Sequence, residues 1–481
     1  MKLSFLVPPC FDHKQPAERS AGCTRVTYFF PNIYELSAAA VLEQSGLDTI
    51  EYHDFVYEKA SKEDLERFFE RDNSDIYLIW TVNLSISTDL ETIEILRRYR
   101  PDVPVILMGP GPTHFIKKCL ADRNVYIVRG EPEATLPELV EALRESRKPT
   151  DIKGVSYVDE EGEVVNNPLR PLIKDLDALP FAARHLLKDR VYRNPKLKVT
   201  PYATLITSRN CPYQCIYCVP SSLTFAREIE YRSANDNKKP TIGFRSPENV
   251  EKEIKILHEQ GVKAIGFMDD NFIWNEERTR ALCGIMKKYG MVWGCQARVD
   301  AITEPIAKML SESGCRYVDL GIESFDDEIL AYIKKGITVS DIHRAIGLLH
   351  KYHVPVKLNV LIGSSPLETT ETVKHTLREA KKLKVDQVMF NIVSPFPGTE
   401  FYRLCKENGW LTTDDYVPTD VHRESILNLP NLSAKQMEKL LFRNNLSYFL
   451  SPRFIFRQLR RFHSLGEFKD SLKALKIKLF G

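Results

Sequence analysis

Cys211-Pro-Tyr-Gln-Cys215-Ile-Tyr-Cys218 is the stretch of this 481-residue sequence that says most about its fold and chemistry. Three thiols this close together are typical of iron–sulfur ligation, and a four-iron cluster normally takes four cysteines. The next Cys or His residues along the chain are His258 and Cys283, which lie beyond the reach of one loop. One iron would therefore stay open to a ligand from outside the protein, such as the amino and carboxylate groups of an amino acid.

Other roles for these thiols have weaker support. A structural zinc site would need a second Cys or His pair, which the sequence near the motif does not offer. A disulfide framework suits small secreted chains rather than a chain of this length with 10 cysteines. A chance group of buried thiols stays open as an alternative. We expect the scattered cysteines to be buried thiols: Cys10, Cys23, Cys119, Cys283, Cys295, Cys315 and Cys405.

The composition is that of an ordinary globular protein, with 43% hydrophobic and 27% charged residues. A net charge of +2 gives no global field for binding nucleic acid, so we expect no nucleic-acid partner. No apolar run reaches transmembrane length, and the apolar start of the chain is too short for a signal peptide. We therefore expect a cytoplasmic protein whose thiols stay reduced.

The first 150 residues alternate β-rich runs with amphipathic stretches, which predicts a doubly wound parallel sheet covered by helices. We expect strands at 2–7, 48–52, 76–80, 105–108 and 125–128, and helices near 35–45, 61–71, 87–99, 113–121 and 132–145. Ligands of such sheets bind over the carboxyl ends of the strands. Residues 151–200 predict a linker with a small hairpin at 154–165.

A second β-α alternation covers residues 201–405 and predicts a partial (β/α)6 barrel. Its expected strands lie near 203–207, 263–268, 291–297, 316–321, 355–361 and 387–391. Barrel chemistry belongs at the carboxyl ends of the strands, and the cysteine motif follows the first of them. Residues 406–481 predict a helical C-terminal region.

The spacing C-x3-C-x2-C, with Tyr217 before the last cysteine, resembles the motif of the radical S-adenosylmethionine (SAM) superfamily. Four further strand ends resemble the same family, in the family's order. The resemblance implies SAM contacts at Asp270 and Asn271 after the second strand, Arg298 after the third, Glu323 and Ser324 after the fourth, and Ile362 and Gly363 after the fifth. Asn359 stands where the family often has glycine.

The resemblance implies that Cys211, Cys215 and Cys218 bind a [4Fe–4S] cluster and that SAM binds its open iron. One electron from the cluster would cleave SAM to methionine and a 5′-deoxyadenosyl radical, which takes a hydrogen from the substrate. The protein's share is binding, orientation and exclusion of water. A non-catalytic cluster-binding sensor or scaffold is the alternative from another functional class.

The α/β domain ahead of this barrel resembles the cobalamin-binding class of radical SAM enzymes. The resemblance implies cobalamin contacts at Pro9, Thr81, Asn83, Gly109, Pro110, Gly111, Gly130 and Glu131. Two features depart from the class. The Asp-x-His-x-x-Gly loop that supplies a histidine to cobalt in many cobalamin proteins is missing, with Phe11-Asp12-His13-Lys14 its nearest counterpart. Tyr34-Glu35 also stands where relatives often carry Gly-Leu.

The class implies C-methylation of an unactivated carbon as the reaction. The alternative within the class is radical cyclisation or rearrangement of a tetrapyrrole or lipid-like substrate. We expect a small-molecule or lipid-like substrate and a one-electron donor such as flavodoxin or ferredoxin. The basic amphipathic segment 452–481 can contact an anionic membrane surface or, as we favour, cover the barrel with its basic face in water.

Overall fold

The computed structural model describes residues 1–9, 11, 30–46, 49–120, 122–194, 196–414, 416–452 and 454–455. The chain divides into two compact units. The first contains Met1–Pro212, Val219–Gln296 and Glu312–Arg316, and the second contains Tyr213–Cys218, Ala297–Ser311 and the chain from Tyr317 onward. Within the described residues, no helix has both the length and the apolar character needed to cross a bilayer.

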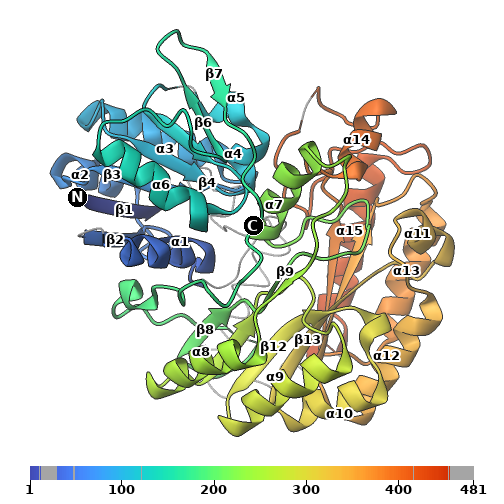
Figure 1. The fold of residues 1–481 in the computed structure, drawn as a ribbon. Helices are drawn as coiled ribbons and strands as arrows, with labels where there is room; N and C mark the ends of the chain where they lie inside the picture. Colours follow the sequence, from blue (N-terminus) through green and yellow to red (C-terminus); the bar gives the residue numbers. More distant parts are fainter. Residues whose placement is uncertain are drawn as a thin grey trace. The chain divides into compact units, whose positions relative to one another are not determined.

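A seven-stranded sheet forms the first part of the first unit, with strand order β2-β1-β3-β4-β5-β6-β7 (Figure 1). Its parallel strands are β1 (Lys2–Val7), β2 (Thr49–Asp54), β3 (Ile76–Trp80), β4 (Val105–Met108) and β5 (Val125–Val128). These strands confirm the predicted positions. The expected hairpin, β6 (Val155–Val158) and β7 (Val164–Asn166), is present as well, and it extends this sheet in antiparallel pairing.

Helices cover both faces of this sheet, as the alternation predicts. One face packs on α2 (Lys62–Arg71), α3 (Ile86–Tyr99) and α5 (Ile116–Cys119), with Tyr77, Leu107 and Ile127 among the strand residues buried there. The other helices of this part are α1 (Ile33–Gln44), α4 (Pro110–His114) and α6 (Pro132–Arg144), and α1 packs on α6 and β3. After the hairpin, the chain forms a short 3-10 helix, η1 (Arg184–Leu187).

The second alternation begins within the first unit. Strands β8 (Tyr202–Leu205), β11 (Ala264–Phe267) and β12 (Val292–Ala297) pair in parallel in that order. Their helices are α7 (Ser222–Ser233), α8 (Pro247–Glu259) and α9 (Glu276–Lys288). The short antiparallel pair β9 (Ser208–Arg209) and β10 (Gly243–Phe244) was not predicted from the sequence; β9 precedes the cysteine loop and α7, and β10 follows α7.

The second unit continues the alternation with parallel strands β13 (Cys315–Glu323), β14 (Val356–Ile362) and β15 (Gln387–Ile392). The helical elements of this part are η2 (Val299–Ala301), α10 (Glu304–Glu312), α11 (Asp327–Tyr332), α12 (Val339–Lys351), α13 (Thr370–Lys382), α14 (Glu400–Glu407) and α15 (Ala434–Phe449). Six strands of the described chain thus alternate with helices at the predicted positions. The C-terminal region is helical at α15, and residues 456–481 lie outside the described residues.

Candidate active site

The cysteine loop follows β9, and all three of its thiols are half-buried and not disulfide-bonded. The amide N–H of Cys218 donates to the carbonyl of Cys215 at 3.3 Å, which makes a tight turn between these two residues. In the described parts of the chain, no three His, Cys, Asp or Glu side chains already converge on a metal site. The donor set nevertheless fits an iron–sulfur cluster, because three closely spaced thiols are the ligands that such clusters take.

Arg298 follows β12 and packs on the cysteine loop within the second unit. Its guanidinium carbon lies 3.5 Å from the centre of the Tyr213 ring. Asp300 accepts from the guanidinium at 3.0 and 3.1 Å, and the carbonyl of Lys335 accepts at 2.7 Å. Arg298 is the predicted partner of the SAM carboxylate, and the structure gives it an oriented, nearly buried guanidinium.

A buried ion pair lies beside the loop. Glu323 ends β13 at a register shift, with a left-handed backbone (φ 59°), and its carboxylate lies 2.8 Å from Lys335 Nζ. Lys335 also donates to the Tyr217 hydroxyl at 3.3 Å. Burial lowers the pKa of Lys335, but Glu323 and Cys215 outweigh it and the net pKa is raised. Burial is the main reason that the pKa of Tyr217 lies well above its usual range, and the charge of Glu323 raises this pKa further. Lys335 was not among the site residues predicted from the sequence.

The ends of β13 and β14 are fixed by hydrogen bonds to side chains further along the chain. The Ser324 hydroxyl lies 3.2 Å from the Thr376 hydroxyl. Glu368, another residue that the sequence analysis missed, accepts from the amides of Gly363 and Ser364 at 2.8 and 2.7 Å. Gly363 has φ 82°, which favours glycine. Ile362 before it is buried.

The end of β11 carries three polar side chains in the first unit, of which Asp269 and Asn271 are buried and Asp270 is partly buried. Asp269 accepts from the backbone and the hydroxyl of Thr207 at 3.1 and 2.8 Å, and so ties the end of β11 to the end of β8. Asp270 accepts from the amide of Ser221, and burial raises its pKa. One oxygen of Asp270 and the side-chain oxygen of Asn271 have no hydrogen-bond partner among the described residues.

The carboxyl edge of the first sheet fits a polar ligand. The Thr81 hydroxyl and both ends of the Asn83 amide are buried and have no partner within the described part of the chain. An added Cβ at Gly109 (φ 96°) would lie 2.7 Å from the carbonyl oxygen of Thr81, and one at Gly111 would lie 3.0 Å from Val82. The hydroxyl of Thr81 and the amide of Asn83 suit a corrin, whose rim carries amide groups.

Pro110 starts α4, and Pro9 is buried after β1. Residues 12–14, the nearest counterpart of the missing histidine loop, lie outside the described residues.

Tyr34 and Glu35, which depart from the class pattern, both support the end of β3. The Glu35 carboxylate accepts from the amide of Trp80 at 2.9 Å. Tyr34 stacks on the Trp80 ring, with 5.2 Å between the ring centres. The indole N–H of Trp80 donates to the Ser222 hydroxyl of α7 at 3.0 Å. Trp80 therefore joins the first sheet to the helix that follows the cysteine loop, and Tyr34 and Glu35 hold Trp80 in place.

Gly130 and Glu131 lie between β5 and α6, and Glu131 already has protein partners. Its Oε1 lies 2.7 Å from Arg209 and 2.9 Å from Arg227, and its Oε2 accepts from the amide of Ile173 at 2.8 Å. The structure therefore places Glu131 in an ion-pair network, whereas the resemblance implied a cofactor contact. Gly130 (φ 68°) lines a cavity of about 260 Å³ together with Arg129 and Arg227.

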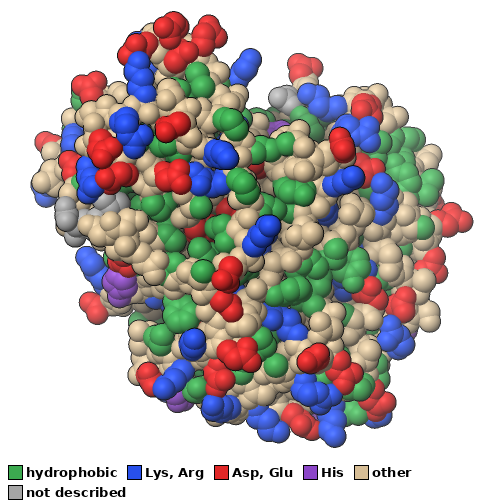
Figure 2. Space-filling view, in the orientation of Figure 1, with side chains coloured by type: hydrophobic (Ala, Val, Ile, Leu, Met, Phe, Trp, Pro, Cys, Tyr) green, Lys and Arg blue, Asp and Glu red, His purple; other side chains and the backbone are tan. Residues whose placement is uncertain are grey.

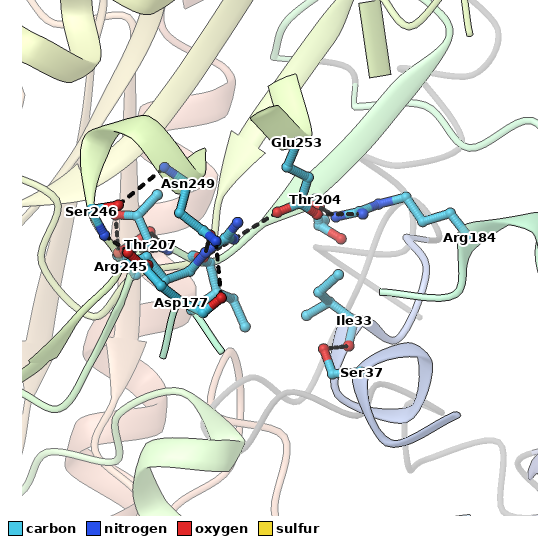
Figure 3. Close-up of polar contacts among 12 residues, drawn as sticks. Ile33, Ser37, Asp177, Arg184, Thr204, Thr207, Arg245, Ser246, Asn249 and Glu253 are labelled. Atoms are coloured by element: carbon cyan, nitrogen blue, oxygen red, sulfur yellow. Dashed lines mark hydrogen bonds and ion pairs between the residues drawn. The ribbon is translucent and has the colours of Figure 1, made fainter. Parts of the chain in front are cut away.

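A second, smaller cavity is lined by Glu253 and Arg245 and also by Arg209 and Glu133; Figure 3 shows the polar contacts around Glu253. Glu253 pairs with Arg184 of η1 and, at 2.6 Å, with Arg245, while Arg184 also donates to the Thr204 carbonyl at 2.7 Å. Asp177 accepts from the amide of Ser246 at 2.9 Å. These contacts tie residues 177–184 firmly to the strands and helices around the cavity.

Comparison with known proteins identifies the family. Residues 205–380 match the family model of the radical SAM superfamily, and residues 20–140 match that of the B12 binding domain. The uncharacterized methyltransferase PH0819 of Pyrococcus horikoshii is 32% identical over 472 residues, which cover 96% of this chain and 95% of that protein. The chain belongs to the cobalamin-dependent radical SAM family. This radical SAM enzyme takes a [4Fe–4S] cluster, SAM and cobalamin as cofactors.

Other relatives of the enzyme are more distant. The hopanoid C-3 methylase of Methylococcus capsulatus is 25% identical, with 74% of this chain and 67% of that protein covered. Among solved structures, the cobalamin-dependent SAM radical enzyme OxsB matches with a TM-score of 0.72 at 15% identity, covering 100% of this chain and 71% of that one. The methyltransferase TsrM from Kitasatospora setae matches with a TM-score of 0.62 at 19% identity, covering 87% and 76%. Both confirm the predicted fold.

Proposed function

We propose that this enzyme is a C-methyltransferase that transfers a methyl group to an unactivated carbon of a small molecule. The observation that carries the proposal is the relative named as a methyltransferase, which matches nearly the whole of both chains at 32% identity. Relatives named for methylation of a hopanoid and of bacteriochlorophyllides support carbon as the acceptor. When bound, the cluster, SAM and cobalamin supply the radical and methyl-transfer chemistry.

The chain's own residues bind and orient these groups. Cys211, Cys215 and Cys218 would hold the cluster. Asp300 orients Arg298, which would hold the SAM carboxylate through a charge-assisted hydrogen bond. Lys335 holds Glu323, which would contact SAM.

Three further groups complete the assignment. The side-chain oxygens of Asp270 and Asn271 that lack a partner among the described residues would hold the SAM amino group. The buried Ile362 and the glycine turn at Gly363 would hold the adenine, and Ser324 would hold SAM as well. Asn83 and Thr81 would hold the amide rim of cobalamin.

The test is an anaerobic assay with the reconstituted enzyme, a reductant and SAM that carries a deuterated methyl group. We expect 5′-deoxyadenosine from the wild type, and a deuterated methyl group on carbon once a substrate is found. Cys215→Ala should lose the cluster absorbance and 5′-deoxyadenosine together, whereas Cys405→Ala, at a buried cysteine outside the motif, should keep both. Formation of 5′-deoxyadenosine by Cys215→Ala would contradict the assignment of the cluster.

A cyclisation is the second candidate, because the anaerobic magnesium-protoporphyrin IX monomethyl ester cyclase of Rubrivivax gelatinosus is 24% identical over 80% of this chain. The two reactions differ in the fate of the methyl group. A methyltransferase moves the deuterated methyl group to the substrate and forms S-adenosylhomocysteine. A product that lacks deuterium, with no S-adenosylhomocysteine formed, would favour the cyclase.

Radical SAM enzymes act on small molecules and need a reductant. We propose flavodoxin or ferredoxin as the electron donor of this one and the cytoplasm as its compartment. Membrane contact through residues 452–481 stays a prediction, because nearly all of that segment lies outside the described residues. Liposome flotation of the full chain and of a chain truncated after residue 451 would test it, and equal flotation of the two would contradict it.

A further inference from the structure

The cysteine loop is flanked by two buried arginines that pair with carboxylates of the first domain. Arg209 lies two residues before Cys211, and Arg227 lies on α7, nine residues after Cys218. Both guanidiniums point to the start of α6, where Glu131 and Glu133 lie. All of these charged side chains belong to the first unit, and each is 9% exposed or less.

The contacts form a chain of ion pairs that runs from Arg227 through Glu131 and Arg209 to Glu133. Arg209 presents one nitrogen to Glu131 at 2.7 Å and the other to Glu133 at 2.5 Å. Arg227 approaches the same oxygen of Glu131 at 2.9 Å. One carboxylate thus serves two cations, and the second carboxylate balances the charge. Buried charges need this kind of mutual pairing, because an unpaired charge inside a protein is strongly destabilising.

The network reaches the first cluster cysteine through Asn210. The terminal nitrogen Nη1 of Arg227 donates to the Asn210 side-chain oxygen at 2.9 Å. Asn210 is 1% exposed and has φ 79°, a left-handed conformation that most residues avoid. Its amide N–H donates to the Thr224 hydroxyl at 3.2 Å and its side-chain nitrogen to the Thr241 carbonyl at 3.0 Å. These contacts fix the backbone from which Cys211 extends.

We propose that Glu131, Glu133, Arg209 and Arg227 are positioning residues that orient Cys211 for cluster binding. The first domain therefore has a second task besides holding cobalamin: it supports the cluster loop. This inference goes beyond the proposed function, because it holds for any reaction that the cluster starts. It also explains why both carboxylate oxygens of Glu131 contact other groups of the protein.

The first test uses Glu133→Gln, which removes one charge and keeps the shape of the side chain. The assay is the rate at which an iron chelator strips the cluster from anaerobically reconstituted enzyme, followed by absorbance. We expect about tenfold faster loss, the usual scale when a residue that supports a metal ligand is changed. The matched control is Glu138→Gln on the same helix, whose pair with Arg170 is at the surface, with Glu138 52% exposed. Its stripping rate should equal that of the wild type.

A second variant covers the case in which Glu133→Gln does not fold or does not load a cluster. Arg227→Lys keeps the charge but cannot reach Glu131 and Asn210 together, because it lacks the planar fork. In the cluster-free protein, mass spectrometry compares alkylation of Cys211 with that of Cys218. We expect Cys211 to react faster in Arg227→Lys than in the wild type, relative to Cys218.

Two results would overturn the proposal. One is a folded Glu133→Gln protein that loses its cluster at the wild-type rate. The other is an Arg227→Lys protein with wild-type near-ultraviolet circular dichroism and an unchanged ratio of Cys211 to Cys218 alkylation. Neither measurement depends on methyl transfer, so failure of the proposed reaction would not be mistaken for failure of the network.

Discussion

Replacing Glu323 with Gln is the sharpest test of how the buried charges beside the cysteine loop act. The Glu323 and Lys335 side chains are 7% and 9% exposed, and their charged atoms are 2.8 Å apart. The substitution keeps the shape of the side chain but removes the carboxylate that pairs with the buried ammonium of Lys335, beside which the Tyr217 hydroxyl remains.

The expected magnitude follows from this geometry. Two unit charges at 2.8 Å attract each other by about 6 kcal/mol at an effective dielectric constant of about 20. Desolvation of both ions offsets much of this attraction. Removing one partner of a buried pair nevertheless costs about 3–5 kcal/mol, because the remaining charge is uncompensated. We expect Glu323→Gln to lower the free energy of unfolding by that amount.

Lys334 next in sequence provides the matched control. Lys334 pairs with Glu400 at the same distance of 2.8 Å, but these side chains are 51% and 35% exposed. Glu400→Gln should therefore cost less than about 1 kcal/mol. Urea unfolding of both cluster-free variants at neutral pH, followed by circular dichroism, gives the two values. Equal destabilisation by the two substitutions would refute the claim that burial decides the strength of the Glu323–Lys335 pair.

Three other predictions concern single positions. Asp269→Ala should lower the free energy of unfolding by about 3 kcal/mol in urea titrations, because two Thr207 donors lose a buried charged acceptor; a cost below about 1 kcal/mol would contradict this. Gly109→Ala should reduce the cobalamin retained after anaerobic gel filtration, since its new Cβ would meet the Thr81 carbonyl at 2.7 Å, and wild-type retention would show that the turn adapts. Burial raises the pKa of Cys405 from 9.0 to about 12, so the unfolded chain loses this proton first as pH rises. The thiol's contribution to stability is complete below pH 9 and falls by about 1.4 kcal/mol at pH 10. Cys405→Ala should show a smaller loss of stability than the wild type between pH 8 and pH 10, and parallel pH profiles would argue against the raised pKa.

The architecture could be predicted because its strands carry strong local patterns. Strands such as 76–80 and 105–108 are short apolar runs between polar stretches, and the structure places them at the expected residues. The β9–β10 pair could not be found in this way, since two residues on each side show no alternation. Figure 2 shows positive and negative side chains interspersed over the face in view, as the small net charge suggests.

The site was harder to predict where a charged side chain pairs with another that is distant in sequence. Cys211 is visible through its spacing, but Lys335 and Glu368 resemble ordinary solvated residues until the fold buries them. Arg209 and Glu131 are 78 positions apart, and no feature of the sequence around either residue indicates that the two form an ion pair.

The contact between Gly363 and α15 has a consequence for how relatives of this protein are compared. A Cβ at Gly363 would collide with the sulfur of Met437, so this late helix forms a wall behind the fifth barrel strand. A homologue that ends before this helix could keep every motif residue and still lack the side chain that packs behind the proposed adenine site. The presence of the cysteine motif is therefore a poor guide to activity among shorter homologues, and the residue that fills the place of Met437 should be checked as well.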